Sequence, residues 1–193
     1  MTLCTIAPTE LILGGQKSGK SRRAEQLAAT WLAEPGHRAV FIATAQPWDA
    51  EMVERINRHQ RDRAERVPGM LTVEEPLQLA EAIAQHSRAD TLVVVDCLTL
   101  WLTNLLMPAE FKENKPLAQI PPAQVATLLV AIGATPGPLV LVGNEIGLGV
   151  IPMGREVRAF VDALGSLNQQ VAQRCQRVVL MAAGLPLTLK DAA

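Results

Sequence analysis

Residues 14 to 21 read GGQKSGKS, which matches the phosphate-binding loop pattern G-x-x-x-x-G-K-[ST] at every specified position. Glycines in such a loop let successive backbone N–H groups point at phosphate oxygens, while Lys20 reaches the terminal phosphates and the Ser21 hydroxyl ligates Mg²⁺. The loop therefore predicts binding of a nucleoside triphosphate. The residues expected to contact it are Gly14, Gly15, Gln16, Lys17, Ser18, Gly19, Lys20 and Ser21.

A Mg²⁺ site also needs an acidic residue at the end of a later buried strand, and Asp96 follows the apolar run Thr91–Val95. Ligands of open α/β sheets collect at the carboxyl edge, beside the loops that follow the strands. We therefore predict that Asp96 and Ser21 hold the metal. The alternative is that Asp96 caps a helix starting near Leu98, and the two roles are compatible.

A polar helix is expected from Glu51 to Arg63, after a strand that ends before Thr44, and it places His59 among arginines. A solvated charged helix is one interpretation, because isolated surface histidines are common. The second interpretation is catalytic, since arginine binds phosphate oxygens with two hydrogen bonds and a neutral imidazole is a competent nucleophile toward phosphorus.

Apolar runs without polar alternation alternate with helical patterns, which predicts an α/β fold with a mostly parallel sheet and helices on both faces. The expected strands are 10–13, 39–43, 91–95, 139–142 and 178–181, and the expected helices are 20–33, 51–63, 76–86, 98–107, 122–132 and 155–175. A further strand at Leu185–Lys190 follows after three residues, so we expect it to pair antiparallel with the preceding one. Residues 1–193 are predicted to form a single domain.

Three helical or connecting segments carry further expectations. The segment Leu98–Met107 is apolar nearly all round, which indicates a buried helix or a subunit contact, and Pro108–Pro122 is expected to be a long surface connection. The last helix, 155–175, is expected to pack against the core through one apolar face. That face comprises Val157, Phe160, Val161, Leu164, Leu167 and Val171.

Composition excludes several classes of protein. The formal net charge is −1 and aromatic residues make up 3%, so nucleic-acid binding is not expected. No apolar run has the length of a membrane span, and the start of the chain does not resemble a signal peptide. The three cysteines, Cys4, Cys97 and Cys175, lack metal-ligand spacing. We expect a cytoplasmic protein that acts on a small molecule.

Several motifs occur in one order over nearly the whole chain: GGQKSGKS, FIATAQ, RINRHQRDR, TVEEPLQLA, VVVDCLTLWLTNLL, LVGNEIGLGVIP and AAGLPLTLK. Together they resemble the bifunctional adenosylcobinamide kinase/adenosylcobinamide-phosphate guanylyltransferase family. The resemblance implies a P-loop NTPase-like enzyme that phosphorylates adenosylcobinamide and then transfers GMP from GTP to the product. It leaves open whether ATP or GTP serves the kinase step.

The same resemblance assigns roles to particular residues. It implies that His59 carries the covalent GMP and that Lys20 and Mg²⁺ stabilise the leaving pyrophosphate. It also implies a homo-oligomer, trimeric in similar proteins. Nucleotide contacts are expected from Ile42, Ala43, Thr44, Gln60, Arg61, Asp62, Arg63, Glu74 and Asp96.

Two alternatives stay open at the level of sequence. One is a P-loop small-molecule kinase in which His59 is idle, and the other is a GTP-binding switch without enzymatic activity. The remaining histidines, His37 and His86, are interpreted as solvated residues near turns or helix ends. Asn144 and Glu145 follow a buried strand and are ranked below His59 as substrate contacts. Departures from the family pattern near Met70 and Met153 put corrinoid contacts there in doubt.

Overall fold

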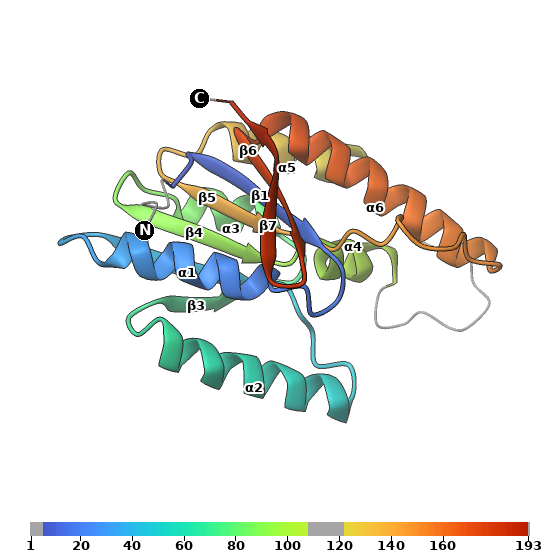
Figure 1. The fold of residues 1–193 in the computed structure, drawn as a ribbon, viewed down its shortest axis with the longest axis horizontal. Helices are drawn as coiled ribbons and strands as arrows, with labels where there is room; N and C mark the ends of the chain where they lie inside the picture. Colours follow the sequence, from blue (N-terminus) through green and yellow to red (C-terminus); the bar gives the residue numbers. More distant parts are fainter. Residues whose placement is uncertain (1–5, 108–121, 193) are drawn as a thin grey trace.

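The computed structural model describes residues 6–107 and 122–192, which build one twisted sheet covered by helices (Figure 1). Its seven strands stand in the order β3-β2-β4-β5-β1-β6-β7. Their bounds are β1 Thr9–Gly14, β2 Arg38–Ala43, β3 Leu71–Glu74, β4 Thr91–Asp96, β5 Leu139–Val142, β6 Arg177–Ala182 and β7 Leu185–Asp191. The α/β class is confirmed.

Every neighbouring pair of strands from β3 to β6 is parallel, and β7 alone runs antiparallel, against β6. The prediction of a mostly parallel sheet with an antiparallel C-terminal strand is confirmed. The central strands are apolar throughout because both of their faces are covered: Val93, Val94 and Val95 of β4 have no exposed surface.

Helices cover the sheet in two layers. Their bounds are α1 Lys20–Leu32, α2 Ala50–Arg66, α3 Leu79–His86, α4 Leu98–Leu106, α5 Pro122–Gly133 and α6 Arg155–Arg174. Apolar residues of α3, α4, α5 and α6 pack on one face of the sheet. Apolar residues of α1, together with Val67 just after α2, pack on the other face. The prediction that the helix at Leu98 is buried is confirmed, since Trp101 and Leu102 lie in the core.

The strand β3 was not expected from the sequence. Its four residues form the edge of the sheet beside β2, and none of their side chains is fully buried. A short edge strand of mixed polarity lacks both the continuous apolar run and the strict alternation that identify a strand. Pairing with β2 therefore decides its conformation.

Two helices begin at other residues than expected, and a carboxylate binds backbone N–H groups near the start of each. The carboxylate of Asp49 accepts a hydrogen bond from the backbone N–H of Met52 at 2.7 Å, so α2 begins at Ala50. The carboxylate of Glu75 accepts the N–H groups of Leu77 and Gln78, and α3 begins only at Leu79 rather than at residue 76.

The expectation for the last helix is wrong for its first half. Leu164, Leu167 and Val171 of α6 are buried as predicted, whereas Val157 is 51% exposed and Val161 is only half-buried. The N-terminal part of α6 extends past the sheet, so it has an apolar face with less core to cover it.

Two other expectations concern the connection at 108–122 and the membrane. Residues 108–121 of the expected connection lie outside the described residues. Within the ranges 6–107 and 122–192, no helix is long and apolar enough to cross a membrane.

Gly137, at the start of β5, gives a test of the packing at the amino edge of the sheet. A Cβ there would lie 1.9 Å from the carbonyl oxygen of Arg88, so backbone atoms would have to move. We expect Gly137→Ala to lower the free energy of unfolding by about 1–3 kcal/mol or more, measured by urea denaturation. Gly133→Ala is the matched control: Gly133 faces open space at the end of α5, so no destabilisation is expected. Equal stability of the two variants would contradict this packing.

Candidate nucleotide and catalytic site

The loop between β1 and α1 follows a path that only glycine allows at both of its ends. Gly14 has φ 152° and Gly19 has φ 101°. A Cβ on Gly14 would lie 2.6 Å from both the carbonyl oxygen of Met181 and the hydroxyl of Ser18. The β6–β7 turn supports the loop from outside, because the N–H of Gly184 donates to the carbonyl oxygen of Ser18 at 3.0 Å.

The first turn of α1 is free to bind an anion. Its N-cap is Gly19, which has no side chain to accept the N–H groups of the first turn. These N–H groups and the helix dipole favour a phosphate. Lys20 is buried, and its ammonium donates to the carbonyl oxygen of Gly15 at 2.6 Å, folding back over the loop. Burial lowers the pKa of Lys20, and the charge of Asp96 opposes this shift.

Asp96 and Ser21 lie together although they are 75 residues apart. The hydroxyl of Ser21 donates to the Oδ2 atom of Asp96 at 2.6 Å. The strand β5 lies between β4, which carries Asp96, and β1, which leads into α1, so α1 brings Ser21 across β5. A hydroxyl and a carboxylate at the end of a phosphate-binding loop form the oxygen set that Mg²⁺ takes in triphosphate sites, so the residues present fit the metal.

The alternative role for Asp96, as a helix cap, is wrong. Asp96 is the last residue of β4, and the N-cap of α4 is Cys97, whose sulfur accepts the N–H of Leu100 at 3.5 Å. Burial, with a further contribution from the charge of Asp96, raises the pKa of the Cys97 thiol to about 12. This thiol stays protonated at neutral pH, so it is a poor nucleophile.

Thr44 holds the end of β4 in place. Its hydroxyl donates to the carbonyl oxygen of Cys97 at 2.7 Å and accepts the N–H of the same residue at 2.8 Å. Its own carbonyl oxygen accepts the side-chain amide of Asn104 at 2.8 Å. Thr44 is fully buried, so these hydrogen bonds hold Cys97, the residue that follows Asp96, in a fixed position. A nucleotide contact from the segment Ile42, Ala43 and Thr44 stays a prediction.

Three of the residues expected to bind nucleotide, Gln60, Arg63 and Glu74, take part in contacts that hold α2 against the rest of the protein. Arg63 is buried, with its guanidinium 3.8 Å from the centre of the Phe41 ring, and it donates to the Thr72 hydroxyl. Gln60 donates to the carboxylate of Glu74 at 3.0 Å, connecting α2 to the end of β3. The other two expected residues lie toward solvent: Arg61 is exposed, and Asp62 pairs with Arg66.

His59 lies exposed on α2, between Arg55 and Arg63 at spacings of four residues that share one helix face. Both neighbours feel the charges of the phosphate-binding site. The positive charge of Arg55 is among the causes that lower the pKa of Lys20, after burial. Burial lowers the pKa of Arg63 as well, against the opposing charges of Glu25 and Asp96. This face of α2 is therefore within electrostatic reach of the site, although His59 has no hydrogen bond within the described residues.

The end of β5 enters the site more closely than the sequence suggested. β5 lies between the strands that end at the phosphate-binding loop and at Asp96. The backbone N–H of Asn144 donates to the buried hydroxyl of Thr99, and its carbonyl oxygen accepts the buried amide of Asn168. The N–H of Glu145 donates to the carbonyl oxygen of Gly14 at 3.1 Å. The signal in the sequence was the pair Asn-Glu directly after a buried apolar strand.

The other two histidines lie away from this edge. His37 is half-buried: its ring stacks on Trp31 with ring centres 3.8 Å apart, and its Nδ1 atom lies 3.1 Å from the Trp31 carbonyl oxygen. It therefore lies near the end of α1, as expected, but is only partly solvated. His86 ends α3 and lines a cavity at the amino edge of the sheet, opposite the phosphate-binding loop.

Comparison with solved structures identifies the fold. The flagellar accessory protein FlaH from Methanocaldococcus jannaschii superposes with a TM-score of 0.51 at 11% identity, covering 96% of this chain and 79% of that one. The RadB recombinase gives a TM-score of 0.50 at 15% identity, covering 91% and 75%. At these identities the similarity concerns the fold, which is P-loop NTPase-like.

Comparison with characterised sequences identifies the family. The chain is 46% identical over 181 residues to the bifunctional adenosylcobalamin biosynthesis protein CobP of Pseudomonas aeruginosa, covering 94% of this chain and 96% of that protein. It is 34% identical over 187 residues to the corresponding protein CobU of Escherichia coli, covering 93% and 98%. Residues 10–189 match the family model of cobinamide kinase / cobinamide phosphate guanyltransferase. The chain therefore belongs to this family of transferases.

Proposed function

We propose that this protein phosphorylates adenosylcobinamide and then transfers GMP from GTP to adenosylcobinamide phosphate through a histidine–GMP intermediate. The observation that carries the proposal is the hydrogen bond between Ser21 and Asp96 at the phosphate-binding loop, in a chain of this family. It favours an enzyme with a formed triphosphate site. The location of His59 between Arg55 and Arg63, whose charges interact with those of Lys20 and Asp96, supports a second, nucleotidyl-transfer step.

In the kinase step, the terminal hydroxyl of cobinamide attacks the γ-phosphorus of a triphosphate, the bond from that phosphorus to the bridging oxygen breaks, and a nucleoside diphosphate leaves. Free N–H groups at the start of α1 and the Lys20 ammonium bind and stabilise the phosphate oxygens. Ser21 and Asp96 would hold Mg²⁺. When bound, the metal neutralises charge that develops on the transferring phosphoryl group.

In the transferase step, an imidazole nitrogen of His59 attacks the α-phosphorus of GTP, a phosphorus–nitrogen bond forms, and pyrophosphate leaves. A phosphate oxygen of cobinamide phosphate then attacks the same phosphorus, and the phosphorus–nitrogen bond breaks to restore the imidazole. Exposure of His59 leaves its ring open to both reactants. Arg55, on the same helix face, is placed to attract their phosphates.

The finer assignments are part of this proposal. ATP or GTP serves as the phosphoryl donor, Mg²⁺ is the metal, and the enzyme is a cytoplasmic homo-oligomer, with a trimer as the expected state. The contacts of Ile42, Ala43, Arg61, Asp62 and the other residues named above with the nucleotide are expected to form when it binds.

Lys20→Ala removes a buried positive charge from the phosphate-binding loop. We expect the rates of both half-reactions to fall by about 10²-fold or more, because both use a triphosphate at this loop. Steady-state rates with cobinamide and with cobinamide phosphate measure the two losses. Arg174→Ala, which removes an exposed positive charge at the end of α6 and touches no residue expected to bind nucleotide, is the control and should keep wild-type rates. Wild-type rates for Lys20→Ala in both assays would exclude the loop from the mechanism.

Asp96→Asn keeps the shape of the side chain and removes the charge that a hard cation prefers. We expect a higher Mg²⁺ requirement, so that activity lost at low Mg²⁺ recovers partly as the concentration rises. A titration of the kinase rate against Mg²⁺ measures this shift. Loss of activity that no Mg²⁺ concentration relieves, with an unchanged thermal transition, would count against Asp96 as a metal ligand.

His59→Ala tests the covalent step and distinguishes this enzyme from a simple kinase. With α-labelled GTP, the wild type should retain a label that mild acid removes and alkali does not, as expected of a phosphoramidate. The variant should lose the label and about 10³-fold or more of GMP transfer. It should keep the kinase rate, since that step needs no enzyme nucleophile.

His86→Ala is the matched control for the labelling experiment, because His86 lies at the opposite edge of the sheet. It should label as the wild type does. A labelled His59→Ala variant would show that another residue carries GMP. A wild type that takes no label while it phosphorylates cobinamide would support the simple kinase.

A further inference from the structure

The loop between β5 and α6, residues 143–154, carries a concentration of exposed apolar side chains. Val150 is 96% exposed, Met153 is 95% exposed and Ile151 is 76% exposed. Leu148 is exposed as well, and Val157 continues the apolar surface onto the first turn of α6. Exposed apolar side chains that gather in this way mark a binding surface, because each costs free energy in water.

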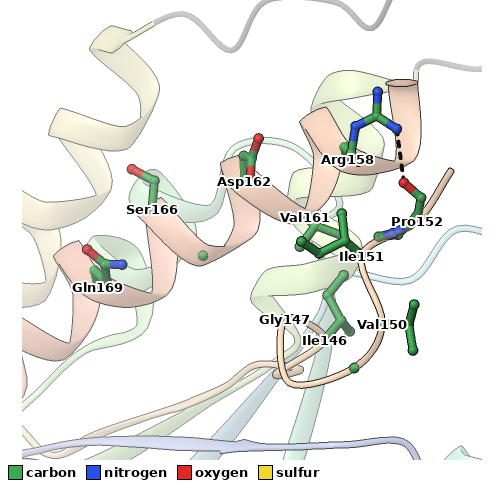
Figure 2. A pocket seen from close by; sticks show the side chains of 12 residues that line it. Ile146, Gly147, Val150, Ile151, Pro152, Arg158, Val161, Asp162, Ser166 and Gln169 are labelled. Atoms are coloured by element: carbon green, nitrogen blue, oxygen red, sulfur yellow. Dashed lines mark hydrogen bonds between the residues drawn. The ribbon is translucent and has the colours of Figure 1, made fainter. Parts of the chain in front are cut away.

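A cavity of about 450 Å³ lies between this loop and α6. Ile146 and Ile151 of the loop and Val161 of α6 form its apolar part (Figure 2). Asp162, Ser166 and Gln169 project from α6 at spacings of three and four residues along the same hollow. The cavity thus combines an apolar wall with a row of hydrogen-bonding groups, which is typical of small-molecule sites.

The loop is fixed at both of its ends. At its start, Asn168 of α6 donates to the carbonyl oxygen of Asn144 at 3.1 Å. Near its end, the guanidinium of Arg158 donates to the carbonyl oxygen of Pro152 at 3.0 Å, shown as a dashed line in Figure 2. The guanidinium of Arg158 is already bonded to a backbone carbonyl oxygen. The side chains left to bind a ligand, Asp162, Ser166 and Gln169, carry no positive charge. A ligand with many negative charges does not fit this cavity.

The β5–α6 loop that lines the cavity begins next to the phosphate-binding loop. The N–H of Glu145, at the start of the β5–α6 loop, donates to the carbonyl oxygen of Gly14. The cavity and the phosphate-binding loop are thus connected through a short piece of backbone at the end of β5. A second cavity, of about 360 Å³, lies among His37, Arg38 and Arg88 at the amino edge of the sheet, which is the edge opposite the phosphate-binding loop.

We propose that the cavity between the β5–α6 loop and α6 binds the corrin ring of cobinamide. The inference rests on the proposed function, which requires an acceptor with a flat, methyl-bearing ring and uncharged carboxamide side chains. Ile146, Ile151 and Val161 match the apolar edge of such a ring. Asp162, Ser166 and Gln169 match its carboxamides, which both donate and accept hydrogen bonds. An open hollow of this volume holds one edge of the ring and leaves the hydroxyl arm free to reach Lys20.

Ile151→Asp tests the apolar wall with the full chain. We expect the Kd for cobinamide, measured by equilibrium dialysis, and its KM in the kinase assay to rise about 10- to 100-fold, because an apolar contact is replaced by a charge. Affinity for GTP and covalent GMP labelling should stay at wild-type values, since neither involves the corrin. Ser166→Trp, which fills the hollow from α6, should act in the same direction.

Val130→Asp is the matched control, because Val130 is an exposed valine on α5 away from the cavity. It should bind cobinamide as the wild type does. Unchanged cobinamide affinity in both Ile151→Asp and Ser166→Trp would overturn the proposal. The proposal would also be overturned if these variants lost cobinamide affinity because they changed oligomeric state, measured by sedimentation. The loop would then be a subunit contact. A wild type that does not phosphorylate cobinamide would instead refute the proposed function itself.

Discussion

The contact between the Ser21 hydroxyl and the Asp96 carboxylate is the constraint on which the rest of the site depends. It requires that α1 start at the end of β1 and reach across β5 to the end of β4. The separation between β1 and β4 is fixed because helices pack on both faces of the sheet and bury these strands. The loop glycines then allow the backbone to turn within the small space beside Met181.

Buried polar groups give this arrangement its precision. Thr44 joins the ends of β2 and β4 through two hydrogen bonds to Cys97, and Asn104 of α4 donates to the carbonyl oxygen of Thr44. Each of these groups would be costly to bury without a partner, so the bonds hold the strand ends in one register. Asp96 is therefore positioned by the fixed backbone of Cys97 as well as by its own hydrogen bond with Ser21.

The proposed nucleophile lies in a different environment from the phosphate-binding loop. Lys20 is buried in a fixed site, whereas His59 is exposed on a helix that is attached mainly through its C-terminal half, where Arg63 packs on Phe41 and Arg66 pairs with Glu25. The buried ammonium of Lys20 suits phosphoryl transfer, in which negative charge on the phosphate oxygens must be stabilised at a fixed place. An exposed imidazole suits a step in which two large substrates must approach the same atom in turn. The proposed corrin cavity, on the opposite side of the loop, gives the acceptor a third surface.

The sequence by itself determined the phosphate-binding loop, the parallel sheet with its antiparallel last strand, and the family, because these depend on local glycine geometry and on apolar runs that pack on both faces. It determined less about surfaces. It did not reveal β3, whose conformation comes from pairing with β2, and it predicted a buried face on α6 where Val157 is exposed. Arg63 was expected to contact the nucleotide, and the sequence did not reveal that its guanidinium also packs against Phe41. Periodicity shows which side of a helix is apolar, and only the tertiary structure decides whether the protein's own core or a ligand covers that side.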